Sequence, residues 1–131
     1  LTVVGACNDC HTPGWEPAGD APNADRLVGM PVGFRGPWGT SYPANLRLTA
    51  TRYTADEWVT MIRNRNDLPP MPWMNLHGMT ERDLKAIHAY LVWLGPKGEP
   101  MPSALPPDVE PTTPYIVFEP VMPAGHGTAS H

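Results

Sequence analysis

Two segments of the chain carry apolar residues at spacings of three and four, which is typical of amphipathic helices. The first opens at Thr54–Glu57, "TADE", a capping box, and continues for about three turns with Trp58 and Ile62 toward the core. The second opens at Thr80 in "TERD" and is ended by the Gly-Pro pair at 95–96. Its apolar stripe is formed by Leu84, Ile87, Leu91 and Leu94. The pattern predicts these two helices more clearly than any other element.

The rest of the chain shows little periodicity. Residues 12–53 contain many turn-forming residues and predict a long ordered loop. From residue 96 the chain is rich in proline and predicts an extended tail, in which "YIVFE" at 115–119 is the one segment with the pattern of a strand or an apolar strap. We therefore expect a folded domain over residues 1–95 and an extended tail over residues 96–131, packed on that domain or on a partner.

Composition indicates that something besides side chains must help to fill the core. The chain has 131 residues, the size of a single domain, of which 18 are proline and 12 glycine. A formal net charge of −4 without a run of lysine or arginine argues against nucleic acid or an anionic membrane surface as a partner. No stretch approaches the ~20 apolar residues of a membrane-spanning helix. Because the chain begins in the apolar segment "LTVVGAC" without a methionine, we expect a signal peptide before Leu1 and an extracytoplasmic, periplasmic location.

Both cysteines lie in one motif, "CNDCH", at residues 7–11. A disulfide between Cys7 and Cys10 would close only a very small loop and staple nothing distant. A thioredoxin-like redox pair needs a helix after the motif, whereas "TPG" at 12–14 breaks the chain there. A zinc site needs further ligands, and no second Cys/His pair stands at finger-like spacing. The fourth interpretation is covalent haem attachment, for which C-x-x-C-H is the signature.

The chemistry of haem attachment suits this spacing. One helical turn separates Cys7 from Cys10, so both sulfurs can form thioethers to the vinyl groups along one haem edge, with His11 as the proximal iron ligand. A planar cofactor would also give the long loop something to wrap around. The aromatic residues that are candidates to line it are Trp15, Phe34, Trp38, Tyr42 and Tyr53.

The second axial ligand is sought between the two predicted helices, in "RNDLPPMPWMNLHGM" at 65–79. Met71 is favoured because a proline on each side stiffens its backbone, which lowers the entropy cost of holding a thioether on iron. Met74, three residues further on, remains an alternative. His77 is a second alternative and would produce bis-histidine ligation.

In these motifs the chain resembles the class I c-type cytochromes, most of all the single-haem domains of bacterial dehydrogenase-linked cytochrome subunits. The order of C-x-x-C-H, then Met-Pro, then a capped helix ending in Tyr-Leu is more specific than any one motif. The matching pieces cover most of residues 3–95 and are "GACNDCHTPG" (5–14), "PWGTSYPANL" (37–46), the Trp58 helix, "PPMPW" (69–73) and "MTERDLKAIHAYL" (79–91).

The resemblance implies an all-α fold: three to four short helices wrapped around one covalently attached haem c, with long ordered loops and a proline-rich C-terminal extension. It also implies an N-terminal helix that crosses the last core helix near Tyr90. Cys7, Cys10 and His11 would hold the haem, and Met71 would be the distal ligand. Two features depart from the family: the helix before Cys7 is short, and the tail has no place in the minimal fold.

The function expected from this resemblance is one-electron transfer with His/Met ligation, without catalytic residues and without a small-molecule substrate. The partner would be a redox protein, such as a dehydrogenase or a terminal oxidase. Two alternatives remain: a haem subunit or domain of a larger dehydrogenase with the tail as a docking strap, and a gas- or peroxide-binding protein if Met71 does not ligate iron. Candidate partners of the haem propionates or of the loops are Tyr42, Asn45, Arg47, Arg63 and Arg65.

Overall fold

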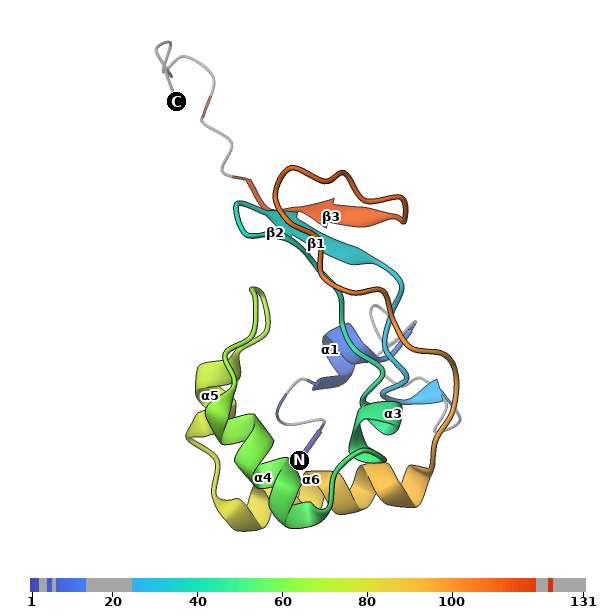
Figure 1. The fold of residues 1–131 in the computed structure, drawn as a ribbon, viewed down its shortest axis with the longest axis vertical. Coiled ribbons are helices and arrows are strands. Elements are labelled where there is room, and N and C mark those ends of the chain that lie inside the picture. Colours follow the sequence, from blue (N-terminus) through green and yellow to red (C-terminus); the bar gives the residue numbers. More distant parts are fainter. Residues whose placement is uncertain (3–4, 6, 14–24, 120–122, 124–131) are drawn as a thin grey trace.

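The computed structural model of the chain describes residues 1–2, 5, 7–13, 25–119 and 123 (Figure 1). Helices α4, α5 and α6 gather at one end of the molecule, the sheet lies at the other, and α1 lies between these two ends in the view of Figure 1. The helices are α1 (Cys7–His11), α3 (Leu46–Ala50), α4 (Ala55–Asn64), α5 (Trp73–His77) and α6 (Glu81–Leu94). The strands are β1 (Gly33–Gly36), β2 (Gly39–Ser41) and β3 (Tyr115–Val117).

The expectation of an all-α fold is wrong, because the chain forms a three-stranded mixed sheet beside its helices. The strand order is β2-β1-β3, with β1 antiparallel to β2 and parallel to β3. In this register Phe34 of β1 lies between Ser41 of β2 and Ile116 of β3. The hairpin requires glycine at Gly39, where φ is +109° and a Cβ atom would collide with the Leu105 carbonyl oxygen. Strands β1 and β2, of four and three residues, are too short to produce a recognisable alternation, which is why the sequence predicts only loop over residues 12–53.

The two helices that the apolar pattern predicts are confirmed as α4 and α6. Both reciprocal hydrogen bonds of the capping box are formed at the N-terminus of α4. The Glu57 amide donates to Thr54 Oγ1 at 3.2 Å, and the Thr54 amide donates to Glu57 Oε1 at 2.9 Å. At α6 the Asp83 amide donates to Thr80 Oγ1 at 3.1 Å, and the helix ends at Gly95 with a positive φ of 81°.

The core forms where α3, α4 and α6 meet. Arg47 of α3 is buried against the end of α6, where its Nε donates to the Gly95 carbonyl at 2.7 Å and its Nη2 to the Leu94 carbonyl at 2.6 Å. This guanidinium satisfies carbonyls that the helix leaves unpaired and complements the negative end of the helix dipole. The buried apolar residues of the core are Leu27, Ala50, Trp58, Val59, Ile62, Leu84, Ile87 and Leu91.

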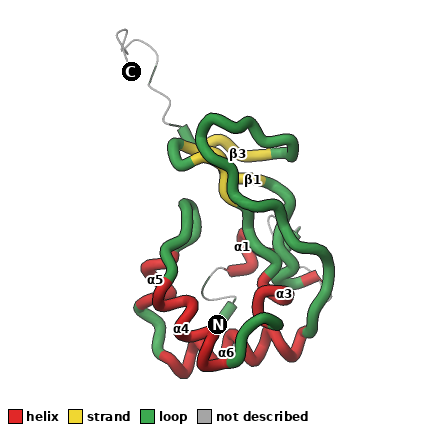
Figure 2. Tube along the Cα trace, in the orientation of Figure 1, coloured by secondary structure: helices red, strands yellow, loops and turns green. Residues whose placement is uncertain are grey.

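After α6 the chain returns to the sheet as a long loop (Figure 2). Asn45 Nδ2 donates to the carbonyls of Lys97 at 2.7 Å and Glu99 at 3.2 Å, and the backbones of Leu105 and Thr40 exchange two hydrogen bonds. The segment "YIVFE", expected to form a strand or an apolar strap, then supplies β3 over Tyr115–Val117. Residues 120–122 and 124–131 of the predicted tail lie outside the described residues. Within the described part of the chain, no helix is both long and apolar enough to cross a membrane.

Candidate functional site

The "CNDCH" motif forms a helical turn. Cys7–His11 is α1, so Cys7 and Cys10, three residues apart, lie on the same side of this turn. Both cysteines are half-buried, and Cys7 packs against the core cluster, as does Tyr90 of α6. The rest of the helix that was expected before Cys7 falls partly on residues 3, 4 and 6, outside the described residues. The helical spacing on which the haem hypothesis depends is therefore present.

His11 is buried and held by one of its two ring nitrogens. Its Nδ1 lies 2.8 Å from the Ala44 carbonyl oxygen, which can only accept a hydrogen bond, so Nδ1 carries the proton of the neutral ring. The lone pair is then on Nε2, the nitrogen that is left to ligate a metal. Burial lowers the pKa of His11 below its ordinary value, although the hydrogen bond to Ala44 and the charge of Asp67 act in the opposite direction. The neutral, ligating form is thus the favoured one.

Two buried polar residues that the sequence analysis did not identify fix the orientation of α1. Thr12 Oγ1 donates to Asn8 Oδ1 at 2.7 Å and accepts from the Leu27 amide at 2.9 Å. The Gly29 amide donates to the His11 carbonyl at 2.8 Å. The signal in the sequence was a pair of small polar residues four apart that flank the histidine, on one face of a helix.

The three candidates for the second axial ligand differ in their surroundings. Met71 is half-buried in the loop between α4 and α5, whereas Met74 lies in α5 with 67% of its surface exposed. His77 Nε2 donates to the Arg65 carbonyl at 2.9 Å, and its ring packs edge-on against Trp73. Both of these contacts of His77 are therefore with other residues of the 65–79 segment. These surroundings favour Met71, which remains a prediction.

Several short contacts restrain the loop around Met71. The Met71 amide donates to the Leu68 carbonyl at 3.2 Å, and the Trp73 amide donates to the Met71 carbonyl at 2.9 Å. Ser41 Oγ donates to the Pro69 carbonyl at 2.6 Å and so joins the loop to β2. Figure 1 shows α1 and this loop on facing sides of the middle of the molecule.

Most of the aromatic candidates contribute to the sheet. The ring centroid of Phe118 lies 5.7 Å from that of Phe34 and 5.9 Å from that of Trp38. The Tyr42 hydroxyl forms a 2.7 Å hydrogen bond with Thr113 Oγ1. Trp15 lies outside the described residues. In three of the five candidates the aromatic ring therefore has a structural partner in the C-terminal segment.

The polar candidates likewise have structural partners. Asn45 caps α3, because its Oδ1 accepts from the Leu48 amide at 3.1 Å. Arg63 Nη2 donates to the Met79 carbonyl at 3.0 Å, and Arg65 pairs with Asp67 at 2.5 Å. Arg47 binds the end of α6, as described above.

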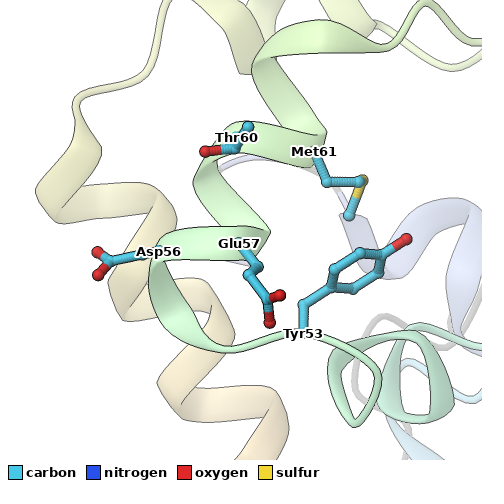
Figure 3. Close-up of a pocket in the computed structure, with 5 residues that line it drawn as sticks. All are labelled: Tyr53, Asp56, Glu57, Thr60 and Met61. Atoms are coloured by element: carbon cyan, nitrogen blue, oxygen red, sulfur yellow. The ribbon is translucent and has the colours of Figure 1, made fainter.

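An open pocket of about 380 Å³ lies on the side of α4 (Figure 3). In Figure 3 the Met61 side chain and the Tyr53 ring face one another across it, whereas Asp56 points away, toward its ion pair with Lys85 at 2.8 Å. The lining residues are Tyr53, Asp56, Glu57, Thr60 and Met61. None of the predicted haem ligands lines this pocket.

The donor set fits a haem. Cys7, Cys10 and the lone pair of His11 come from one helical turn, as thioether attachment requires. Trp58 Nε1 is buried and has no hydrogen-bond partner among the described residues, a state that costs about 1–3 kcal/mol unless a bound group accepts the proton. Among all residues that the structure describes, no three His, Cys, Asp or Glu side chains converge on a point where a metal ion could bind.

Comparison of the chain with protein-family models, with curated proteins and with solved structures gives no match. The resemblance to class I c-type cytochromes therefore rests on the motifs of the chain itself.

Proposed function

We propose that the chain carries one covalently attached haem c on α1 and works as a one-electron carrier. The observation that carries this proposal is the geometry of His11, a buried imidazole whose Nδ1 donates to the Ala44 carbonyl at 2.8 Å. Iron-ligating histidines are commonly fixed in this way, because the second hydrogen bond sets both the tautomer and the direction of the ring.

The cysteines supply the covalent link. On attachment of a haem, each thiol of Cys7 and Cys10 would add across one vinyl double bond, so that sulfur would bond to one carbon and the thiol hydrogen would go to the other. The reaction needs no oxidant, because no electrons are gained or lost overall. The position of both residues on a single turn supports attachment along one edge of a planar group.

Met71 completes the ligand set in this proposal. Its thioether favours ferrous iron and raises the reduction potential, and the restrained loop lowers the entropy cost of keeping a weak ligand in place. When bound, the haem supplies a reversible one-electron step between ferric and ferrous iron. If His11 and Met71 both held the iron, no position would remain on it for a substrate, and electron transfer is the activity that this ligand set would support.

The partner is a redox protein that forms a transient interface, such as a dehydrogenase or a terminal oxidase. The exposed apolar side chains of Leu68 and Met74 flank Met71 and support a small docking surface there. Thioether attachment further supports an extracytoplasmic site such as the bacterial periplasm.

A second candidate function is that of a haem subunit in a permanent dehydrogenase complex. It is favoured by the exposed apolar residues of the C-terminal segment, Ile116, Val117 and Phe118, which are between 41% and 52% exposed. A permanent complex predicts that a partner chain co-purifies with the protein, and a free shuttle predicts that it does not.

Optical spectra of the purified protein, oxidised and reduced, test the proposal. We expect the sharp bands of low-spin haem in the reduced state and the weak near-infrared iron–methionine band in the oxidised state. Attached haem without that band would remove methionine from the ligand set and favour either His77 as the second ligand or an open site that binds a gas or peroxide. A purified protein without any haem absorbance would refute the proposal.

A further inference from the structure

A hydrogen bond connects the sheet to the loop that holds Met71. Ser41, the last residue of β2, donates through Oγ to the Pro69 carbonyl at 2.6 Å. Pro69 precedes Met71 by two residues, and the turn between them is closed by the hydrogen bond from the Met71 amide to the Leu68 carbonyl. A displacement of Pro69 therefore moves the backbone that carries the methionine.

Ser41 is itself held by the whole sheet. It pairs with Phe34 of β1, and its neighbour Thr40 exchanges backbone hydrogen bonds of 2.9 and 2.8 Å with Leu105. On the other side of β1 the C-terminal segment adds β3, and the Phe118 ring packs against Phe34. The sheet thus offers a rigid support from which a hydroxyl reaches the loop.

We propose that Ser41 is a positioning residue that holds Met71 on the iron by fixing Pro69, and that the sheet supports this contact. The inference rests on the proposed function. In this arrangement β3 supports β2 through β1, because β1 pairs with both strands.

The physical basis is the weakness of the bond between thioether sulfur and iron. A ligand from solution competes with such a bond, and the outcome depends on how much freedom the loop gains when sulfur leaves the metal. Loss of one hydrogen bond of ordinary net strength raises the apparent affinity of a competing ligand about three- to tenfold.

The test compares Ser41→Thr with Ser41→Val, two side chains of equal size of which only threonine keeps the hydroxyl. The probe is imidazole, titrated into the ferric haem-loaded protein, together with the midpoint potential. We expect Ser41→Thr to behave as the native protein, and Ser41→Val and Ser41→Ala to bind imidazole about three- to tenfold more tightly with a lowered potential. Ser103→Ala, at an exposed serine, serves as the control.

Equal imidazole affinities in the threonine and valine variants would overturn the role of Ser41, while attached haem and the iron–methionine band would leave the proposed function standing. If the native protein lacks attached haem or that band, the proposal for Ser41 falls together with the ligand set on which it rests. Altered unfolding without altered imidazole affinity would also count against a positioning role.

Discussion

His11 Nδ1 lies 2.8 Å from the carbonyl oxygen of Ala44, a residue 33 positions further along the chain. Ala44 directly precedes Asn45, which caps α3 and also binds the carbonyls of Lys97 and Glu99. The carbonyl that orients His11 is therefore fixed by a helix cap and by the C-terminal segment. The direction of the imidazole follows from this arrangement.

Substitution of Asn45 should lower stability in two separable steps. Asn45→Ser keeps an oxygen that can cap α3 but removes the donors to Lys97 and Glu99, whereas Asn45→Ala removes both functions. Loss of an N-cap costs about 0.5–2 kcal/mol. We expect the free energy of unfolding, measured with denaturant, to fall in the order native, Asn45→Ser, Asn45→Ala. Equal values for the two variants would show that the cap contributes nothing.

Substitution of Met71 and of Met74 by leucine should separate the two methionines. Met71→Leu is expected to abolish the near-infrared iron–methionine band and to lower the midpoint potential, because leucine cannot ligate iron. Met74→Leu serves as the matched control and should keep both, since Met74 is exposed on α5. Haem should stay attached in both variants. Loss of the band and a lowered potential in Met74→Leu but not in Met71→Leu would assign the ligand to Met74.

Arg47 should contribute strongly to stability. In Arg47→Met the aliphatic volume is retained, but the carbonyls of Leu94 and Gly95 lose their buried donor, which costs about 1–3 kcal/mol. Arg52→Met, at an exposed arginine, is the control and should change little. Denaturant unfolding of the three proteins measures this difference. A similar, small effect of both substitutions would exclude the capping role.

The ion pair between Asp56 and Lys85 should stabilise the protein in a pH-dependent way. The hydrogen bond from Lys85 and its charge lower the pKa of Asp56 below its usual 3.8. The contribution is therefore complete above pH 3.8 and is lost as the pH falls through the lowered pKa. We expect Asp56→Asn to lower the melting temperature slightly at neutral pH and not at all in strong acid. A difference that persists in strong acid would have another cause.

The two long helices could be predicted from the sequence because their signals are local. The capping box at Thr54, the cap at Thr80 and the apolar stripes lie within the elements that they define. The sheet could not be predicted in this way, since β1 pairs with β3 across some eighty positions and each strand has at most four residues. Its register depends on tertiary contacts such as the packing of Phe118 on Phe34.

The candidate site also combines features that depend on neighbouring residues with features that depend on contacts between distant segments. The sequence offers "CNDCH" as a candidate haem-attachment site because the whole pattern is contained in five consecutive residues. The bond from His11 to Ala44 and the support of Pro69 by Ser41 join segments that are far apart in the chain, and no local pattern predicts them. For Asn8 and Thr12 the four-residue spacing can be read from the sequence, but their burial is known only from the structure.

The most direct test of the account is the intact mass of the protein after denaturation, following production with the haem-attachment machinery of a bacterial periplasm. We predict the mass of the polypeptide plus one haem for the native protein, and of the polypeptide alone for the Cys7→Ser/Cys10→Ser double variant. A native protein that has the mass of the bare polypeptide would contradict the central claim that "CNDCH" is a haem-attachment site.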